Sequence, residues 1–207
     1  MTTDATVFVV DDDIDMRQSL KWLIESVGMP VEAFASAEQF LEGYEAARPG
    51  CLLLDVRMPG MGGIRLLEYL QKAGVHLPTI VFTGHGDVPM AVQALKSGAF
   101  DFIEKPATHQ QILDRIQDAL AMERDRRARQ SRRYALENAL TQLSQREREV
   151  LDGVVEGRSN KVIAVGLGIS ERTVEKHRQN IMQKMGTSSL AELIRMVVLY
   201  QMNSGRY

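Results

Sequence analysis

Polar residues that can do chemistry follow apolar runs in the first half of the sequence. Those that directly follow a run are Asp11, Asp12, Asp13, Asp55, Thr83 and Lys105. Carboxylates gathered at one point repel one another unless a cation compensates, and hard oxygen ligands of this kind suit Mg²⁺. A carboxylate beside Mg²⁺ and an ammonium can act as a nucleophile that accepts a phosphoryl group as an acyl phosphate.

The apolar runs themselves predict the elements that would bring these residues together. Strand-like runs occupy 6–10, 31–34, 51–54, 79–82 and 101–104, and segments of helical period lie between them. Connections of this length imply a doubly wound α/β fold with a five-stranded parallel sheet. Sites in such sheets lie in the crevice at the carboxyl ends of the strands. We therefore expect the polar residues to face one crevice.

Local signals mark the ends of the predicted helices. Asp13 is expected to cap the first helix rather than bind metal, and Ser36 with Gln39 fits a capping box. Asp87 is expected to cap a helix that ends at Gly98. One apolar face of the first helix is predicted to consist of Met16, Leu20, Leu23, Ile24 and Val27.

Asp55 ends a run that is otherwise typical of a buried strand, and a loop rich in glycine follows it. A charge in this place would be fixed by the sheet yet open to an incoming phosphate. The loop 58–63 contains Pro59 and three glycines, which let backbone groups approach a metal and a phosphate closely.

Four stretches, VVDDD, LLLDVRMPGMGG, VFTGHGD and DFIEKP, resemble the signature regions of two-component response-regulator receiver domains, in order and at the usual spacing. The resemblance covers about residues 5–122 and implies a flavodoxin-like fold. It implies that a partner histidine kinase phosphorylates Asp55, that the Lys105-Pro106 bond is cis, and that Thr83 and Phe102 form the switch. It further implies phosphoryl binding by Thr83 and Lys105, and Mg²⁺ binding by Asp11, Asp12, Asp55 and the backbone carbonyl of Arg57.

Charge divides the sequence into two halves. Residues 1–120 hold 9 lysines and arginines against 17 acidic residues, whereas residues 121–207 hold 16 against 10. The basic second half suggests a polyanionic partner. Six arginines fall between 124 and 133, and we interpret this segment as a solvated helical linker rather than a contact patch.

Composition excludes other classes of protein. Cys51 is the single cysteine, so neither a disulfide nor a cysteine metal site is expected. No apolar run approaches the length of a membrane span, and we expect a soluble cytoplasmic protein with no membrane partner.

The second half predicts four helices. They begin at Ser144, Ser159, Ser170 and Ser189, with Glu147 and Glu192 completing capping boxes. The second and third are short and joined by LGIS, which is the shape of a helix-turn-helix.

The third of these helices has two faces. We expect His177, Ile181 and Met185 to lie on the side of Val174 and to pack on the second helix through Val162, Ile163 and Leu167. The opposite face carries Arg172, Glu175, Lys176, Gln179 and Gln183. These side chains suit base edges in the major groove, where arginine and lysine bind guanine, glutamine binds adenine and glutamate accepts from cytosine.

The stretches LSQREREVL, GRSNKVIA, LGIS and TVEKHRQNIMQKM closely resemble the LuxR/FixJ type of helix-turn-helix over about residues 138–203. The resemblance implies that residues 172–179, Thr173 among them, enter the groove. Lys161, Arg178 and Lys184 are implied to contact backbone phosphates. Many members have a lysine where Glu175 stands, and an acid there is common in the FixJ-like subgroup.

Together these features predict a response regulator with a receiver domain at 1–122, a linker at 123–140 and a DNA-binding domain at 141–207. Phosphorylation would make it dimerise, change its domain arrangement, or both, and so control its binding to promoter DNA, with RNA polymerase as a further partner. Three alternatives remain: an aspartyl-phosphate hydrolase of the dehalogenase type, a ligand-sensing LuxR-type regulator, and a pseudo-receiver that is never phosphorylated. The hydrolase normally has a second acid where Arg57 stands.

Overall fold

The computed structural model describes residues 5–46, 48–84 and 88–203. The chain divides into two compact units, Met1–Arg127 and Ala128–Tyr207. Within the described ranges, no helix is both long enough and apolar enough to span a membrane.

The first unit is built on a five-stranded sheet in which all neighbouring strands are parallel. Its strands are β1 (Thr6–Val10), β2 (Val31–Phe34), β3 (Gly50–Leu54), β4 (Thr79–Thr83) and β5 (Asp101–Glu104). The order β2-β1-β3-β4-β5 confirms the predicted doubly wound fold. Every residue of β1, β3 and β4 is buried, because helices cover both faces of a parallel sheet.

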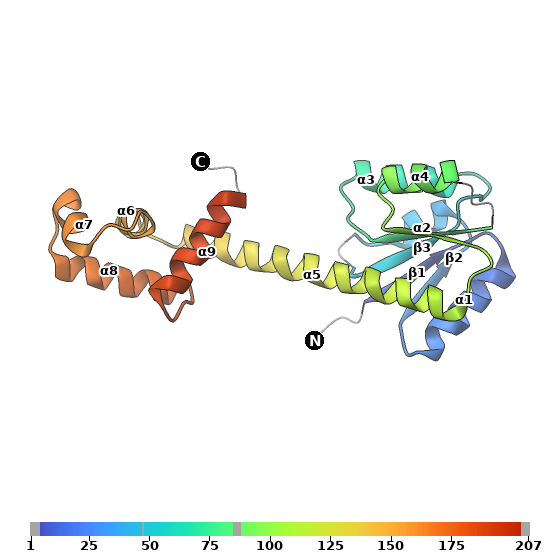
Figure 1. Ribbon diagram of the computed structural model, residues 1–207, viewed down its shortest axis with the longest axis horizontal. Helices are drawn as coiled ribbons and strands as arrows, with labels where there is room; N and C mark the ends of the chain where they lie inside the picture. The colour runs from blue at the N-terminus through green and yellow to red at the C-terminus, as the bar shows by residue number, and fades with distance from the viewer. Residues whose placement is uncertain (1–4, 47, 85–87, 204–207) are drawn as a thin grey trace. The chain divides into compact units, whose positions relative to one another are not determined.

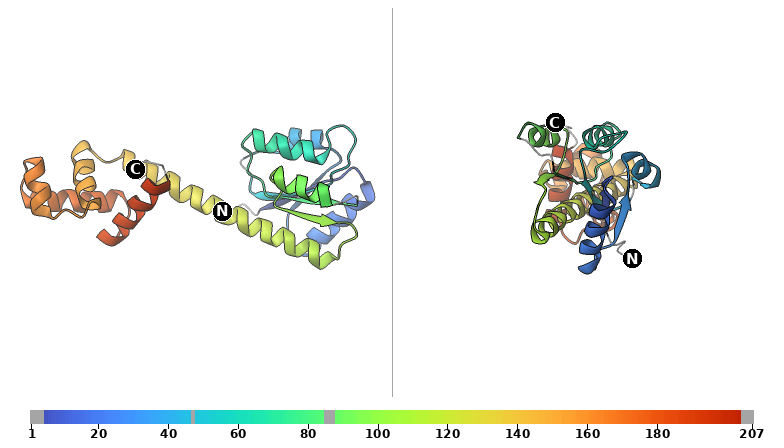
Figure 2. Two further views of the ribbon diagram at one scale, coloured as in Figure 1. Left: turned by 45° about the horizontal axis from the view of Figure 1, so that its top comes forward. Right: turned by 90° about the vertical axis from the view of Figure 1, so that its right-hand side faces the viewer.

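Five helices form the layers on the two faces of this sheet: α1 (Ile14–Ser26), α2 (Ala37–Gly43), α3 (Gly63–Lys72), α4 (Val88–Lys96) and α5 (His109–Thr141). Figures 1 and 2 show α3 and α4 on one side of the sheet and α1 and α5 on the other. Because strand side chains alternate between faces, Phe8 and Leu52 pack with α2, α3 and α4. Val7 and Leu53 pack with α1 and α5.

The predicted helix ends in the first unit are confirmed in part. Asp13 caps α1 by accepting the N–H groups of Asp15 and Met16. Ser36 accepts the N–H of Gln39 at 3.2 Å, but the Gln39 side chain reaches back to Ala35 rather than to Ser36. The capping-box prediction is therefore half right.

The prediction for Val27 is wrong, and the prediction for Asp87 is not tested. Val27, predicted on the apolar face of the first helix, is 47% exposed because it is the C-cap, where the helix has already ended. The predicted cap at Asp87 lies outside the described residues.

The second unit contains the helices α6 (Gln145–Val155), α7 (Asn160–Leu167), α8 (Glu171–Lys184) and α9 (Leu190–Asn203). Ser144 and Glu147 form the predicted capping box of α6. Gly168 ends α7 and Ser170 caps α8, so the two helices form the predicted helix-turn-helix. Ser189 accepts the Glu192 N–H at 3.2 Å, while the Glu192 carboxylate reaches Ser188.

The predicted packing of α7 on α8 is wrong at one position. Ile163 is buried and Leu167 is partly buried, but Val162 is 53% exposed. The buried residues of α7 include Ile163 and Ala164. Successive helical residues point about 100° apart, so Val162 points about 200° away from Ala164, toward the opposite side of the helix.

The arginine-rich segment 123–140 is helical throughout, as part of α5. The prediction that it is solvated is confirmed for residues 128–135, which are all exposed, and is wrong at Glu123 and Leu136. Glu123 is 1% exposed and its carboxylate pairs with Arg126 and Arg127. Leu136 joins the apolar core of the second unit. The division into 1–122, 123–140 and 141–207 stays a prediction.

Candidate phosphoacceptor site and DNA interface

Two buried carboxylates and one lysine converge at the carboxyl ends of β1, β3 and β5. Asp11 and Asp55 are 3% and 7% exposed. The Lys105 Nζ donates to Asp11 Oδ2 at 2.7 Å and to Asp55 Oδ1 at 3.0 Å. The parallel sheet thus brings together residues from three strand ends that lie far apart in the sequence.

The charges in this crevice depend on one another. Burial raises the pKa of the Asp11 carboxyl, and hydrogen bonds from Lys105 and from the Asp13 N–H offset part of this rise. Burial by itself lowers the pKa of Lys105, but the hydrogen bonds and charges of Asp11 and Asp55 outweigh it and the pKa is raised. Lys105 is therefore a cation at neutral pH, shared between two acids.

The loop after β3 folds back onto the carboxylate of Asp55. The Arg57 N–H donates to Asp55 Oδ2 at 2.7 Å, and the Gly63 N–H donates to the Val56 carbonyl at 2.9 Å. A Cβ at Gly63 would lie 2.2 Å from the Asp55 carbonyl oxygen. Only glycine permits so close an approach, which explains why this position carries no side chain.

The other predicted receiver residues lie around this pair. Thr83 is the last residue of β4 and is fully buried, and its carbonyl accepts the Lys105 N–H at 2.9 Å. Phe102 on β5 packs, partly buried, against the core that includes α4. The Lys105-Pro106 bond is cis, as the resemblance implies. Asp12 is exposed beside Asp11.

The oxygen donors in this crevice fit Mg²⁺. Across the described part of the chain, no three carboxylate, imidazole or thiol groups gather closely enough to hold a metal by themselves. Mg²⁺ commonly takes one or two carboxylates and completes its octahedron with phosphate oxygens and waters. The pair Asp11 and Asp55, already facing one cation, is a donor set of this kind.

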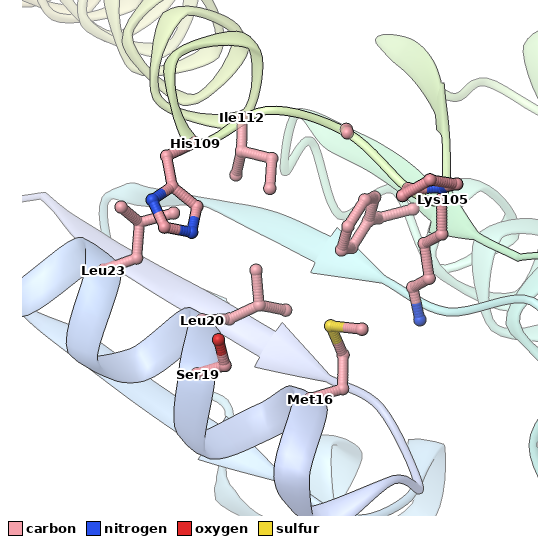
Figure 3. Close-up of a pocket in the computed structure, with 10 residues that line it drawn as sticks. Met16, Ser19, Leu20, Leu23, Lys105, His109 and Ile112 are labelled. Atoms are coloured by element: carbon pink, nitrogen blue, oxygen red, sulfur yellow. The ribbon is translucent and has the colours of Figure 1, made fainter.

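A half-open cavity of about 170 Å³ borders the stem of Lys105 (Figure 3). Its apolar lining includes Leu20 and Leu23 from α1 and Ile112 from α5. Phe82 also lines it, and the Lys105 Nζ lies 4.9 Å from the centre of that ring. Apolar walls along the lysine stem direct its ammonium toward the two carboxylates.

In the second unit, one face of α8 is polar and exposed while the other is buried, as predicted. Val174 and Ile181 are fully buried, and Met185 is nearly so. The exposed face consists of Arg172, Glu175, Lys176, Gln179 and Gln183, with Thr173 partly exposed. This helix is the second of the helix-turn-helix, the place of a groove-reading helix.

Two of the predicted phosphate-contacting residues lie near the start of α7. Lys161 is exposed there. Arg178 reaches across from α8 and donates to the side chain of Asn160, the first residue of α7. Asn160 was not predicted to have a role, because nothing in the local sequence shows which residue Arg178 meets.

Lys184, the third predicted phosphate contact, is engaged inside the unit. Its Nζ donates to Glu147 Oε2 at 2.7 Å and to the Gln142 carbonyl at 3.2 Å. The hydrogen bond from Lys184, followed by that from the Ser144 N–H, lowers the pKa of Glu147 to about 2. The sequence indicated Glu147 as a capping residue, but not this second partner on another helix.

Comparison with known proteins assigns both units. A model of the response regulator receiver domain matches residues 7–117, and a model of bacterial regulatory proteins of the luxR family matches residues 141–197. The transcriptional regulatory protein FixJ of Azorhizobium caulinodans is 45% identical over 199 residues, which is 96% of this chain and 94% of FixJ. The chain belongs to the FixJ-like response regulators.

Solved structures agree with this assignment. The response regulator StyR is 45% identical, with a TM-score of 0.87 over 95% of this chain and all of StyR. Full-length FixJ from B. japonicum is 40% identical, with a TM-score of 0.59 over 97% of this chain and 99% of that one. This response regulator is thus a transcription regulator of a family in which phosphorylation-dependent control is typical. The hydrolase and ligand-sensing alternatives are set aside.

Proposed function

We propose that this response regulator accepts a phosphoryl group on Asp55 from a partner histidine kinase and thereby changes its dimerisation and its binding to promoter DNA. The supporting observation is the pair of buried carboxylates, Asp11 and Asp55, that share the single ammonium of Lys105. Burying two carboxylates beside one lysine costs more than burying one. An ion pair with a purely structural role would therefore contain only one of the two acids.

The proposed transfer uses this geometry directly. An Asp55 carboxylate oxygen forms a bond to phosphorus while the bond from phosphorus to the kinase histidine nitrogen breaks, and the electron pair leaves with that nitrogen. Lys105, now held by Asp55 at 3.0 Å, moves its hydrogen bond to a phosphoryl oxygen. The Thr83 hydroxyl donates to another, and both bonds strengthen as charge develops there.

We infer that Mg²⁺ is the cofactor of this step. Asp11, Asp12, Asp55 and the backbone carbonyl of Arg57 would hold it. When bound, Mg²⁺ supplies positive charge that offsets the repulsion between Asp55 and the incoming phosphoryl group. Slow phosphorylation by small phosphodonors without a kinase, and slow self-dephosphorylation, follow from the same arrangement.

The phosphoryl group is proposed to act through Thr83 and Phe102. Movement of Thr83 toward the phosphoryl oxygens would let Phe102 turn inward from β5 and reshape the surface of α4, β5 and α5. Moving the protein from 1:99 inactive to 99:1 active requires a preference of about 5.5 kcal/mol for the active state. Two or three charge-assisted contacts can supply much of this.

We further propose that α8 enters the major groove and that RNA polymerase is the downstream partner. The proposed base-reading residues are Arg172, Thr173, Glu175, Lys176, Gln179 and Gln183, and the proposed phosphate contacts are Lys161, Arg178 and Lys184. Glu175 has oxygen acceptors and no donor, so it favours the amino group of cytosine over guanine.

Phosphorylation of Asp55 is tested by intact mass spectrometry of the full chain after incubation with Mg²⁺ and acetyl phosphate. We expect the wild type to gain one phosphoryl group that hydroxylamine removes, as it does from acyl phosphates. Asp55→Asn should gain none, whereas the control Asp114→Asn, an exposed acid on α5, should behave as wild type. A phosphoryl group on Asp55→Asn would place the acceptor elsewhere.

The proposed DNA interface is tested by the salt dependence of binding to a duplex selected from a random pool by the phosphorylated protein. Lys161→Ala should weaken binding and lower the slope of log K against log salt by about 1, because one fewer counterion is released. The control Arg146→Ala, exposed on α6, removes the same charge outside the proposed interface. Equal slopes for Lys161→Ala and the wild type would exclude Lys161 as a phosphate contact.

A further inference from the structure

A carboxylate on α2 holds the loop that follows Asp55. Glu38 lies in the first turn of this helix, and its Oε1 accepts the Met61 N–H at 2.8 Å. The preceding residue, Gly60, has a φ of +76°, and a Cβ there would lie 2.8 Å from the same Oε1. The loop backbone therefore bends around the Glu38 carboxylate, and a side chain at position 60 would be strained by the positive φ and would displace that carboxylate.

Glu38 is itself held in place by its helix. Ser36 caps this turn, and Ala37 and Phe40 bury its other side in the core. Hydrogen bonds from the N–H groups of Glu38 itself and of Met61 lower the pKa of the Glu38 carboxyl. At neutral pH the exposed Glu38 side chain is thus an ionised group that accepts the Met61 N–H, on a helix whose start is held by its cap and core contacts.

The other side of the loop is hydrogen-bonded to the residues that directly follow β3. The Arg57 N–H is bound to Asp55 Oδ2 at 2.7 Å, and the Gly63 N–H to the Val56 carbonyl at 2.9 Å. Residues 56–63 are therefore fixed to β3 on one side and to α2 on the other. The Arg57 carbonyl, the proposed metal ligand, belongs to this doubly attached stretch.

We propose that Glu38 is a positioning residue for the phosphoacceptor loop, which keeps the Arg57 carbonyl in place for Mg²⁺. The proposal rests on the proposed function, because it concerns the metal site of that function. Without the Glu38 hydrogen bond, the loop must be ordered when the metal binds, and this loss of conformational freedom lowers the affinity. Glu38 acts through the backbone of Met61 and does not touch the carboxylates of Asp11 or Asp55.

The test compares Glu38→Ala, Glu38→Gln and the control Glu42→Ala in the full chain. Glu42 is exposed one turn further along α2, so its removal changes the charge equally. Two quantities are measured by NMR: amide hydrogen exchange at Met61 without metal, and the dissociation constant for Mg²⁺ from the shifts of the Asp55 and Arg57 amides. Glu38→Gln keeps the oxygen that accepts the Met61 N–H.

For Glu38→Ala we expect exchange at Met61 to rise about tenfold and Mg²⁺ affinity to fall about three- to tenfold, which corresponds to the net contribution of one ordinary hydrogen bond. Glu38→Gln should restore most of the affinity, and Glu42→Ala should match the wild type.

Wild-type Mg²⁺ affinity in Glu38→Ala would overturn the proposal, because the bond would then be structural only. Equal losses in Glu38→Ala and Glu38→Gln would also overturn it, since the effect would then be one of charge. A wild-type protein that shows no saturable Mg²⁺ binding would instead contradict the proposed metal site, and the role of Glu38 with it.

Discussion

Three buried carboxylates in this protein form ion pairs with lysines that are distant in the sequence. Asp11 and Asp55 share Lys105, and Glu147 is held by Lys184. Each of these contacts joins residues far apart in the chain, so its strength depends on how the fold positions both partners. Replacing Lys105 or Lys184 would leave buried carboxylates without a compensating positive charge. The expected consequences differ between these two sites.

Lys105→Met should lower the free energy of unfolding of the first unit by about 2 to 3 kcal/mol at pH 7 without metal. Methionine fills the apolar wall but leaves Asp11 and Asp55 to repel each other. Saturating Mg²⁺ should then stabilise the variant more than the wild type, because the metal replaces the lost cation. Urea unfolding with and without Mg²⁺ measures both effects, and an equal gain from Mg²⁺ in the two proteins would contradict this account.

Lys184→Met should lower the stability of the second unit at neutral pH by about 1 to 2 kcal/mol, a value reduced for solvent screening because the lysine side chain is 37% exposed. The pKa of Glu147 is about 2 in the folded protein and about 4.3 when unfolded.

Since the folded value is the lower one, this stabilisation is fully present above about pH 5 and is lost as the pH falls toward 2. The difference between Lys184→Met and the wild type should therefore shrink over that range. Urea unfolding followed by the NMR signals of α6 and α8 at several pH values measures it. A difference that stays constant from neutral to acid pH would show that Lys184 acts by some means other than Glu147.

At the scale of elements, periodicity in the sequence was enough to predict the strands and the crevice. The runs that became β1, β3 and β4 are buried on both faces, so their apolar pattern is continuous and easily recognised. The caps of α1 and α6 were equally predictable, because a capping hydrogen bond spans only two or three residues. All the residues that form such a cap lie within a few positions of one another, so a short stretch of sequence is enough to predict it.

Contacts between elements were less predictable. Val162 has the apolar character of a core residue, yet it is exposed because α7 packs through the side that carries Ile163 and Ala164. Glu38 is an ordinary helix-start acid until the loop that ends at Gly63 is folded against it. Glu123 lies among arginines, and its burial depends on the first unit beneath it. Each of these properties is set by partners distant in the sequence.

Glu123→Ala should destabilise the first unit by about 1 to 3 kcal/mol, because it leaves Arg126 and Arg127 without their buried acceptor. Asp118→Ala is a matched control in the same unit: Asp118 pairs with Arg115 on the same helix, but its side chain is 56% exposed, whereas the side chain of Glu123 is 2% exposed. The control should cost less than about 0.5 kcal/mol. Urea unfolding followed by the amide signals of β3 measures both, and equal effects would show that burial at Glu123 adds nothing.

At the scale of the whole molecule, an acidic receiver and a basic DNA-binding unit lie in one chain. Residues 1–120 carry 17 acids against 9 basic residues, and residues 121–207 carry 10 against 16. The proposed function requires that a change at Asp55 in the first unit alters DNA binding by the second. Coupling between two sites is a free energy that can be measured, so this requirement can be tested directly.

The most direct measurement is the dissociation constant of the full chain for a selected DNA duplex, before and after phosphorylation with acetyl phosphate, at one salt concentration. For the wild type we predict that phosphorylation raises the affinity at least about tenfold, a coupling of about 1.4 kcal/mol. For Asp55→Asn we predict no change. Equal affinities of the phosphorylated and unphosphorylated wild type, or the same increase in Asp55→Asn, would contradict control of DNA binding through Asp55.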